Sequence, residues 1–321
     1  MERIELCKAA QLLKDADCVL ILSHKSPDGD TIGSGFALKH ALTMLGKRAW
    51  VLCSDPISDR YDYMDIAQEG APDENAMIVS VDIADTSLLG EKLKPYADRI
   101  TLSIDHHISN TGYAKYLLLR EKAAANCELM LDLIKAMGLA ITPLIADCLY
   151  TGLVTDTGCF RYASTTVDSH RVAQELLLAG ARKDLIHQRM FESTSRGKMS
   201  LMVTALQSLR YELGGQCAMM YLPRDRIEEE GVTDDELEGI SSIPREIAGV
   251  RVGVTLRQYR SRKGYKISVR TDTTVNACAI CKRAGGGGHA GAAGCNIEGT
   301  TFEEAYSIIL KAVSDELSQN S

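Results

Sequence analysis

Imidazole and carboxylate side chains follow three separate apolar segments of the chain. The first segment is "CVLILS" (18–23), which runs into the sequence "ILSHKSPDGDTIGSG" (21–35). In chain order the three groups are His24, Asp28 and Asp30, then Asp82 and Asp85, then Asp105, His106 and His107. If they meet in one crevice, the carboxylates repel one another and take up protons unless divalent cations compensate their charge. The residue types and their spacing therefore predict a metal site.

The donor atoms of this predicted site are oxygen and nitrogen, and no cysteine lies among the three groups. Such a set suits manganese, iron or cobalt, and the histidines disfavour magnesium. An aspartate at a strand end is also a common helix N-cap, so each residue taken singly has a structural interpretation. Asp156, an isolated acid in "YTGLVTDTGCFRY", is either a further partner in the site or a helix-terminal or turn aspartate.

Buried strands are the elements that must position these residues. Four short runs are mostly apolar without clean alternation, at 18–23, 49–54, 77–82 and 100–105. Such runs are typical of strands buried on both faces of a parallel sheet. A helical pattern at 33–46 lies between two of them and ends in a glycine. This alternation predicts a doubly wound α/β domain, in which ligands bind beyond the carboxyl ends of the strands.

A second, smaller α/β domain is predicted toward the C-terminus. Residues 123–185 are mainly helical, and runs that alternate as strands follow at 216–224, 250–259 and 265–271. With 321 residues the chain is long enough for two domains. We expect a first domain over 1–190, a helical connector over 191–214 and a second domain over 215–321, with an active-site cleft between the domains.

Charge is distributed unevenly along the chain. Residues 245–290 contain ten Lys/Arg and two Asp/Glu, although the net charge of the whole chain is −7. A basic lobe facing an acidic body suits an anionic ligand, and an evenly solvated basic surface is the alternative. The run "AGGGGHAGAAG" ends this segment, and its bare N–H groups are suited to binding an oxyanion, a flexible loop being the alternative.

Composition is near the average for a globular protein, with 45% hydrophobic and 25% charged residues. Most of the ten scattered cysteines are expected to be free thiols, and the pair Cys278 and Cys281 is interpreted as buried or half-buried sulfurs rather than a zinc site. No apolar run approaches the roughly 20 residues of a membrane span, and the start of the chain is charged rather than signal-like. We therefore expect a cytoplasmic protein.

Five motifs, in this order, resemble the DHH phosphoesterase superfamily: "HKSPDGDTIGS", "VDIADTS", "SIDHHISN", "TGLVTDTGCFRY" and "GGGGHAGAAG". The resemblance covers essentially the whole chain. It is nearest to the two-domain nanoRNase and pAp-phosphatase type and the related cyclic-dinucleotide phosphodiesterases, which join a DHH domain to a DHH-associated domain. The last motif separates this branch from the inorganic pyrophosphatases of the superfamily, which lack it.

The resemblance implies a binuclear manganese centre, with Co²⁺, Fe²⁺ or Mg²⁺ as other candidate ions. It divides the ligands into His24 and Asp28 for one metal, Asp30, His106 and Asp156 for the other, and Asp82 as the bridge. It also makes His107 the catalytic residue that faces the substrate phosphate, with Asp105 orienting the neighbouring imidazole.

The same resemblance implies where substrate binds in the second domain. The substrate-binding candidates are Ser268, Arg270, Gly286, Gly287, Gly288 and His289, with Arg257 as a further candidate. In the first domain, Asn126 stands where relatives carry a hydroxyl residue, and we expect Glu128 to be an exposed helical glutamate.

The expected activity is manganese-dependent hydrolysis of very short RNA, two to a few nucleotides long, to mononucleotides. Dephosphorylation of 3′-phosphoadenosine 5′-phosphate to AMP is expected as a second activity. The alternative is a phosphodiesterase acting on cyclic di-AMP or linear pApA, and a nucleotide-binding sensor without catalysis is the alternative from another class. A homodimer remains open, and no membrane partner is expected.

Overall fold

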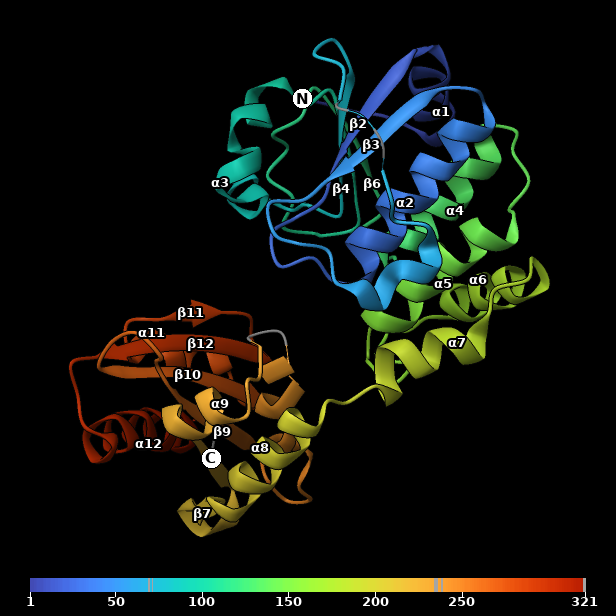
Figure 1. Cartoon of the computed structure of the whole chain (residues 1–321). Coiled ribbons are helices and arrows are strands. Elements are labelled where there is room, and N and C mark those ends of the chain that lie inside the picture. The colour runs from blue at the N-terminus through green and yellow to red at the C-terminus, as the bar shows by residue number, and fades with distance from the viewer. Residues whose placement is uncertain (69, 71, 234–235, 238, 320–321) are drawn as a thin grey trace. The chain divides into compact units, whose positions relative to one another are not determined.

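The structure is a computed structural model that describes residues 1–321 except 69, 71, 234, 235, 238, 320 and 321. The chain divides into two compact units, unit 1 over Met1–Ser193 and unit 2 over Thr194–Ser321 (Figure 1). Both units combine a sheet with helices, which confirms the predicted α/β class. Among the described residues, no helix has the length and apolarity needed to cross a membrane.

A six-stranded sheet forms the centre of unit 1, and all its strand pairs are parallel. In spatial order the strands are β1 (Glu2–Arg3), β6 (Tyr116–Leu119), β5 (Leu102–Asp105), β4 (Met77–Val81), β2 (Cys18–Leu22) and β3 (Arg48–Leu52). The four predicted strands are confirmed. Because all the strands run in the same direction, their carboxyl ends lie along one edge of the sheet.

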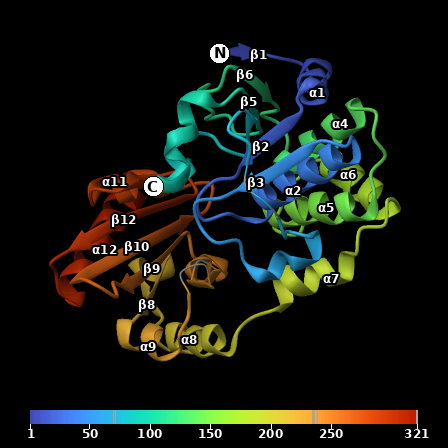
Figure 2. The same ribbon diagram turned by 45° about the horizontal axis from the view of Figure 1, so that its top comes forward.

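Helices cover both faces of this sheet, as Figures 1 and 2 show. One face carries α1 (Leu6–Asp15), α2 (Gly29–Met44), α4 (Asn126–Ala136), α5 (Pro143–Asp156) and α6 (Val167–Leu178), and the other carries α3 (Gly90–Leu93). Side chains of strand β2 are buried on both faces of the sheet. Val19 and Ile21 pack on the face covered by the five helices, whereas Leu20 and Leu22 pack on the face covered by α3. Burial on both faces explains the continuous apolar run in the sequence.

The start of α2 differs from the prediction. The helix begins at Gly29, four residues before the predicted start, because Asp28 caps it. The Asp28 carboxylate accepts hydrogen bonds from the backbone N–H groups of Asp30 and Thr31, both at 3.0 Å. A capped N-terminus satisfies N–H groups that have no partner within the helix. The motif "PDGD" is therefore the first turn of a helix as well as the end of a loop.

Helices α2 and α5 approach each other so closely that glycine is required between them. A Cβ atom on Gly33 would lie 2.3 Å from the Cys148 carbonyl oxygen, and one on Gly152 would lie 2.7 Å from Asp30 Oδ1. Real Cβ atoms do not approach other atoms this closely, so neither position accepts a larger residue without moving a helix. This contact places the N-terminus of α2 beside the C-terminus of α5.

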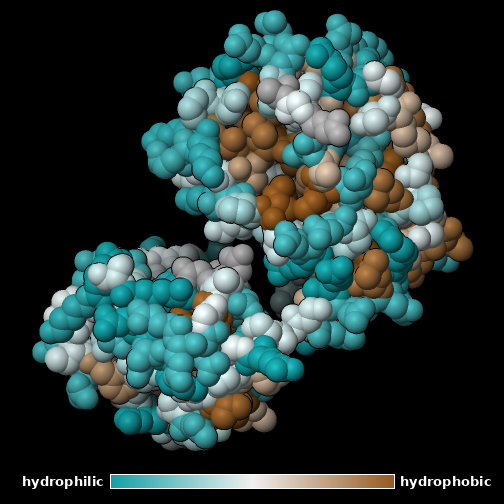
Figure 3. Space-filling model, in the orientation of Figure 1, coloured by the Kyte–Doolittle hydropathy of each residue, from teal (hydrophilic) through white to brown (hydrophobic). Residues whose placement is uncertain are grey.

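Unit 2 is built on a second six-stranded sheet. Its spatial order is β11 (Gly287–Gly288), β12 (Ala292–Glu298), β10 (Gly264–Thr271), β9 (Val252–Gln258), β8 (Cys217–Leu222) and β7 (Arg210–Glu212). All its pairs are antiparallel except β8 with β9. Helices α11 (Ala277–Arg283) and α12 (Phe302–Gln319) cover one face, and α8 (Arg196–Gln207) and α9 (Arg224–Glu229) contribute to a smaller core. The surface of unit 2 seen in Figure 3 is mostly hydrophilic.

The segment predicted as a helical connector contains more than one element. Helix α7 (Lys183–His187) continues into a π-helical turn at Gln188–Glu192. Along the chain, the boundary between unit 1 and unit 2 falls between the next two residues, Ser193 and Thr194. Helix α8 already belongs to unit 2, where Leu201 and Ala205 are buried in the smaller core. Of the two cysteines in the C-x-x-C pair, Cys281 is buried and Cys278 is half-buried on α11.

We predict that Gly33→Ala destabilises unit 1. The added methyl group has to push α5 away from α2, and such overpacking costs about 1–3 kcal/mol of unfolding free energy. This loss outweighs the roughly 1 kcal/mol that alanine gains over glycine inside a helix. Urea denaturation measures the change. Thr43→Ala, at an exposed position of the same helix, is the control and should shift the value by less than about 0.5 kcal/mol. A Gly33→Ala protein as stable as the parent would contradict the helix contact.

Candidate metal centre

The six residues predicted as metal ligands come together at the carboxyl edge of the sheet in unit 1. They are supplied by strand ends and helix ends: His24 after β2, Asp82 after β4, His106 after β5, Asp28 and Asp30 at the start of α2, and Asp156 as the last residue of α5. Asp156 is thus helix-terminal and also part of the cluster. Asp85 is not in the cluster, because it caps the 3₁₀ turn Thr86–Leu89 by accepting the N–H of Ser87.

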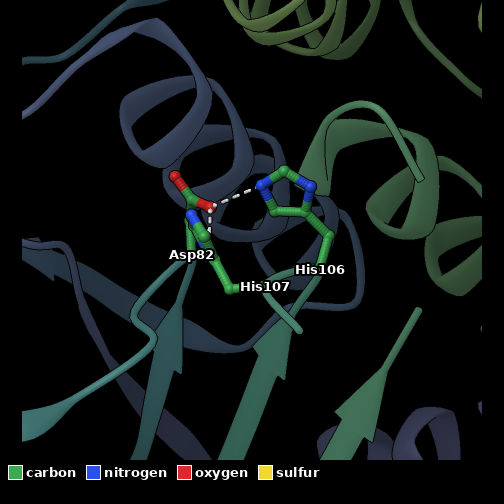
Figure 4. Close-up of side chains that lie close together, drawn as sticks. All are labelled: Asp82, His106 and His107. Carbon is green, nitrogen blue, oxygen red and sulfur yellow. Dashed lines mark ion pairs between the residues drawn. The ribbon is translucent and has the colours of Figure 1, made fainter. Parts of the chain in front are cut away.

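The cluster divides into groups whose potential ligand atoms lie within 4.8 Å of one another. One group is His24, Asp28 and Asp82, a second is Asp30, His106 and Asp156, and a third is Asp82, His106 and His107. The first group contains the ligands predicted for one metal together with Asp82, and the second contains the ligands predicted for the other metal without Asp82. Asp82 lies between them, since its Oδ2 is 3.7 Å from His24 Nε2 and its Oδ1 is 3.3 Å from His106 Nε2. Figure 4 shows His106 and His107 directed at the same oxygen of Asp82.

Backbone carbonyl groups orient both histidines of the two ligand groups. The Nδ1 of His24 is 2.8 Å from the Lys25 carbonyl oxygen, and the Nδ1 of His106 is 3.0 Å from the Ala123 carbonyl oxygen. A carbonyl oxygen only accepts, so each Nδ1 carries the proton. The Nε2 atoms then face the carboxylates and present the nitrogen that a metal would bind.

Asp82 has an unusual conformation and an unsatisfied oxygen. Its φ of +60° lies in the left-handed region, which aspartate tolerates better than most residues. The side chain is 3% exposed, and its Oδ1 accepts no hydrogen bond. A buried carboxylate oxygen without a hydrogen bond costs free energy unless a cation compensates it. This oxygen, together with the N and O donors around it, fits a divalent metal.

Electrostatics in the cluster also favour a cation. Burial raises the pKa of Asp156 to about 8, and the charges of Asp30 and Asp28 add to the effect. Burial likewise raises the pKa values of Asp30 and Asp82, the latter far above its ordinary value. Burial lowers the pKa of His106, but the adjacent carboxylates of Asp82 and Asp30 outweigh it and raise that pKa to about 10. The metal-free centre thus retains protons that bound cations would replace.

Asp30 has a second role that the sequence did not reveal. Helix α4 begins at Asn126 after Ala125, whose side chain cannot cap a helix. The fully buried Asp30 replaces the missing cap, because its carboxylate accepts the backbone N–H groups of Asn126 and Cys127. Asn126, which departs from the family pattern, donates its Nδ2 hydrogen to Ser34 Oγ at 3.0 Å. The departure changes contacts on α2 and leaves the ligand set intact.

Asp105 fixes the orientation of His107. Its Oδ1 accepts the backbone N–H of His107 at 3.2 Å and the ring Nδ1–H at 2.8 Å, while Asn110 Nδ2 donates to Oδ2 at 2.6 Å. The other ring nitrogen of His107 therefore remains available, and the side chain is 41% exposed. Asn110 was not predicted as a site residue. Its position three residues after His107, in a turn, is the only sequence signal for its role.

Glu128 contradicts its prediction as an exposed glutamate. Its residue exposure is 2%, and Ser169 Oγ donates to its carboxylate at 2.6 Å. Burial raises the pKa of Glu128. The prediction was wrong because helix α6, which carries Ser169, packs beside the N-terminal turn of α4.

The predicted substrate-binding residues lie in unit 2, where several of them surround a cavity of about 290 Å³. Ser268 and Arg270 line this cavity, and so do Arg257 and Lys266, the latter not predicted from the sequence. Lys266, Ser268 and Arg270 share one face of β10 because side chains alternate along a strand. Three basic side chains around one small cavity suit a phosphate-bearing ligand.

The glycine run contributes to this cavity in part. Gly287 and Gly288 line it, whereas Gly286 and His289 do not. A Cβ atom on Gly286 would lie 2.2 Å from the Gly294 carbonyl oxygen, and Gly288 has a φ of +143°. Glycine is required at both positions by the pairing of β11 with β12, and an approach of phosphate is not needed to explain them.

The chain matches known families and proteins along most of its length. Residues 18–153 match the DHH family, N-terminal domain, and residues 214–319 match the DHHA1 domain. A Thermus thermophilus protein named "Bifunctional oligoribonuclease and PAP phosphatase NrnA" is 33% identical, over 97% of this chain and 94% of its own. The "Cyclic-di-AMP phosphodiesterase PdeA" of Listeria monocytogenes is 23% identical, over 94% of this chain and 48% of its own. A crystal structure of an exopolyphosphatase-related protein from Bacteroides fragilis is 26% identical with a TM-score of 0.88, covering 97% of this chain and 95% of that one.

A parallel sheet whose carboxyl edge collects carboxylates and imidazoles, together with a second unit whose cavity is lined by basic side chains, is an arrangement that suits a hydrolase with a metal site. Among such hydrolases, the chain belongs to the two-domain DHH phosphoesterase superfamily. The superfamily predicted from the five motifs is confirmed, and so is the prediction that the protein is a hydrolase acting on phosphate esters.

We predict opposite effects of Asp82→Asn on the metal-free and metal-loaded protein. Asparagine tolerates the left-handed backbone and removes a buried acid whose raised pKa destabilises the folded state at neutral pH, so the metal-free unfolding free energy should rise. The variant should also lose the stabilisation that saturating Mn²⁺ gives the parent, about 2.7 kcal/mol at a hundredfold excess over the dissociation constant. Thermal unfolding with EDTA measures the stability of the metal-free protein, and thermal unfolding with Mn²⁺ measures the stabilisation by the metal. Asp85→Asn is the matched control and keeps the response to Mn²⁺; a parent protein that shows no response refutes the centre.

Proposed function

We propose that the protein is a manganese-dependent phosphoesterase that hydrolyses very short RNA to mononucleotides and converts 3′-phosphoadenosine 5′-phosphate to AMP. The observation that carries the proposal is the pair of adjacent ligand groups with Asp82 between them, formed by six side chains from five separate elements. The bifunctional name of the Thermus thermophilus relative supports the choice of substrates. The cytoplasmic location and the homodimer stay predictions.

We assign the ligands to two metals in the way the groups suggest. His24 and Asp28 would hold one ion, Asp30, His106 and Asp156 the other, and Asp82 both. When bound, two divalent ions supply Lewis-acid polarisation of the phosphoryl oxygens and lower the pKa of the attacking water. Imidazole nitrogen with carboxylate oxygen suits Mn²⁺ better than Mg²⁺, and Co²⁺ or Fe²⁺ fit the same set.

His107 is proposed to act on the substrate phosphate directly. Because Asp105 accepts the Nδ1 proton, a protonated His107 carries its second proton on Nε2 and donates it to a phosphoryl oxygen. The buried Asp105 carboxylate fixes the orientation of the ring, and Asn110 holds Asp105 in place. The ring therefore contributes a directed donor where negative charge accumulates during hydrolysis.

Unit 2 is proposed to bind the phosphate and sugar of the substrate through Arg257, Lys266, Ser268 and Arg270. A cavity of about 290 Å³ lies at the lower end of the range for small-ligand sites, which favours one nucleotide over a long strand. The net charge of −7 also opposes extended binding of a polyanion. Both features support short substrates.

A parallel assay of four substrates with Mn²⁺ tests this function. We expect kcat/KM for pApA, for a ribopentanucleotide and for 3′-phosphoadenosine 5′-phosphate to exceed the value for cyclic di-AMP, with mononucleotides as products. Asp82→Ala should abolish all turnover, because it removes the carboxylate that lies between the two ligand groups. Cyclic di-AMP as the preferred substrate would favour the alternative phosphodiesterase, and turnover retained by Asp82→Ala would refute the metal mechanism.

We also predict that Arg270→Ala raises KM for 3′-phosphoadenosine 5′-phosphate more than it lowers kcat. Losing a charged hydrogen bond to a phosphate costs about 1.5–3 kcal/mol, which corresponds to a KM increase of roughly 10- to 100-fold. Arg262→Ala is the matched control, because Arg262 is outside the cavity and pairs with Glu298 at 2.6 Å. Steady-state kinetics measure both variants, and equal KM values would exclude Arg270 from phosphate binding.

A further inference from the structure

Asp82 lies between the two ligand groups in a backbone conformation that has to be held in place. Its φ of +60° is in the left-handed region, which is unfavourable for a residue that carries a Cβ atom. Strained conformations of this kind persist only where the surrounding contacts enforce them, and they are concentrated at functional sites. The contacts that enforce the conformation of Asp82 are therefore candidates for a role in the metal centre.

Hydroxyl groups from two distant segments hold the chain on either side of Asp82. Before it, the Val81 carbonyl oxygen accepts the hydroxyl proton of Thr31 at 3.1 Å. After it, the Ile83 carbonyl oxygen accepts the hydroxyl proton of Tyr113 at 2.8 Å. Thr31 lies in the first turn of α2, and Tyr113 lies in the loop between β5 and β6. Because a peptide unit is planar, holding its oxygen also fixes its plane.

The peptide unit that joins Val81 to Asp82 is held at both of its polar atoms. Its C=O accepts the proton of Thr31, and its N–H donates to the Ile104 carbonyl oxygen at 3.0 Å. Thr31 is fully buried, and its own backbone N–H donates to the Asp28 carboxylate. Thr31 thus relates the position of Asp82 to that of Asp28, which belongs to the same ligand group.

The hydroxyl group of Tyr113 fixes the Ile83 carbonyl group against two strands of the sheet. Its single proton goes to Ile83, because a carbonyl oxygen only accepts. Ser80 Oγ on β4, at 2.8 Å, therefore donates to the Tyr113 oxygen, and Ser103 Oγ on β5 lies 3.3 Å from that oxygen. Both serines are buried. Asn110 Nδ2 also donates to the Ile83 oxygen, over a longer distance of 3.2 Å.

We propose that Thr31 and Tyr113 are positioning residues for the metal centre, because their hydroxyl groups keep Asp82 in the left-handed conformation that places its carboxylate between the two ligand groups. Without either hydroxyl group, the backbone relaxes and the carboxylate turns away in part of the population. The apparent metal affinity then falls in proportion to the fraction that keeps the binding conformation. The inference rests on the metal centre of the proposed function.

A purely structural role for the two hydroxyl groups predicts a loss of stability alone, and unit 1 contains a matched pair that serves as the control. Tyr63 donates to Thr151 Oγ1 at 2.7 Å, and Thr151 donates to the Asp147 carbonyl oxygen at 2.8 Å. Thr151 is fully buried, as Thr31 is. Tyr63 is half-buried, as Tyr113 is. Neither control bond involves a residue of the ligand groups or a peptide unit next to one.

The Mn²⁺ affinity of four variants separates the two roles. Calorimetric titration with Mn²⁺ alone should give a dissociation constant roughly 5- to 30-fold higher for Tyr113→Phe and for Thr31→Val than for the parent, the factor that corresponds to the cost of one left-handed residue. The controls Tyr63→Phe and Thr151→Val should keep a dissociation constant within twofold of the parent value, although each loses a hydrogen bond and its melting temperature falls.

An NMR measurement on the metal-free protein completes the test. The HN–Hα coupling constant and the Cα and Cβ chemical shifts of Asp82 report its φ angle, and they should change in Tyr113→Phe and Thr31→Val but not in the two controls. Mn²⁺ binding within twofold of the parent by both variants would overturn the inference, as would an equal loss of affinity in the controls. If only one of the two variants folds, that variant decides. A parent protein that binds no Mn²⁺ would refute the proposed function itself, which is a distinguishable result.

Discussion

Repulsion among the carboxylates of Asp30, Asp82 and Asp156 is the constraint on which the rest of unit 1 depends. Asp30 and Asp82 are buried and Asp156 is half-buried, all three lie within reach of His106, and removal from water raises the pKa of each. No side-chain packing removes such a penalty, so the surrounding structure has to compensate the charge or tolerate it. The α4 N–H groups and the two oriented imidazoles are each part of that compensation, and bound cations would complete it.

The elements that supply these residues were predictable to the extent that burial is visible in the sequence. The strands preceding His24, Asp82 and Asp105 are apolar on both faces, and the parallel arrangement follows from alternation with helices. Strand β12 was not predicted, because its small residues, "AAGCNIE", form a strand only through pairing with β10 and β11. Strand β6 is only four residues long and was missed between loops.

The membership of the metal centre could be predicted, but the contacts that orient it could not. Residue types and family motifs identify His24, Asp82 and Asp156 without reference to geometry. The roles of Asp30 as the cap of α4 and of Asn110 behind Asp105 depend on contacts with groups that are far away in the sequence or lie in a turn. The error at Glu128 has this cause, since helical periodicity says nothing about a neighbouring helix that covers the first turn. Lys266 was missed because a basic residue on a strand looks like ordinary surface.

The glycine contact between α2 and α5 has a consequence for how this protein can diverge. The separation of Asp30 from Asp156 is set by two backbones in van der Waals contact, at Gly33 and at Gly152, inside the main core of unit 1. Any mutation that changes this spacing also disturbs the core, so the geometry of the candidate metal centre and the fold of unit 1 are inherited together. The cavity of unit 2, which we propose to bind substrate, is lined by side chains of a half-exposed sheet face that can change one at a time, so substrate preference would have more freedom to vary there.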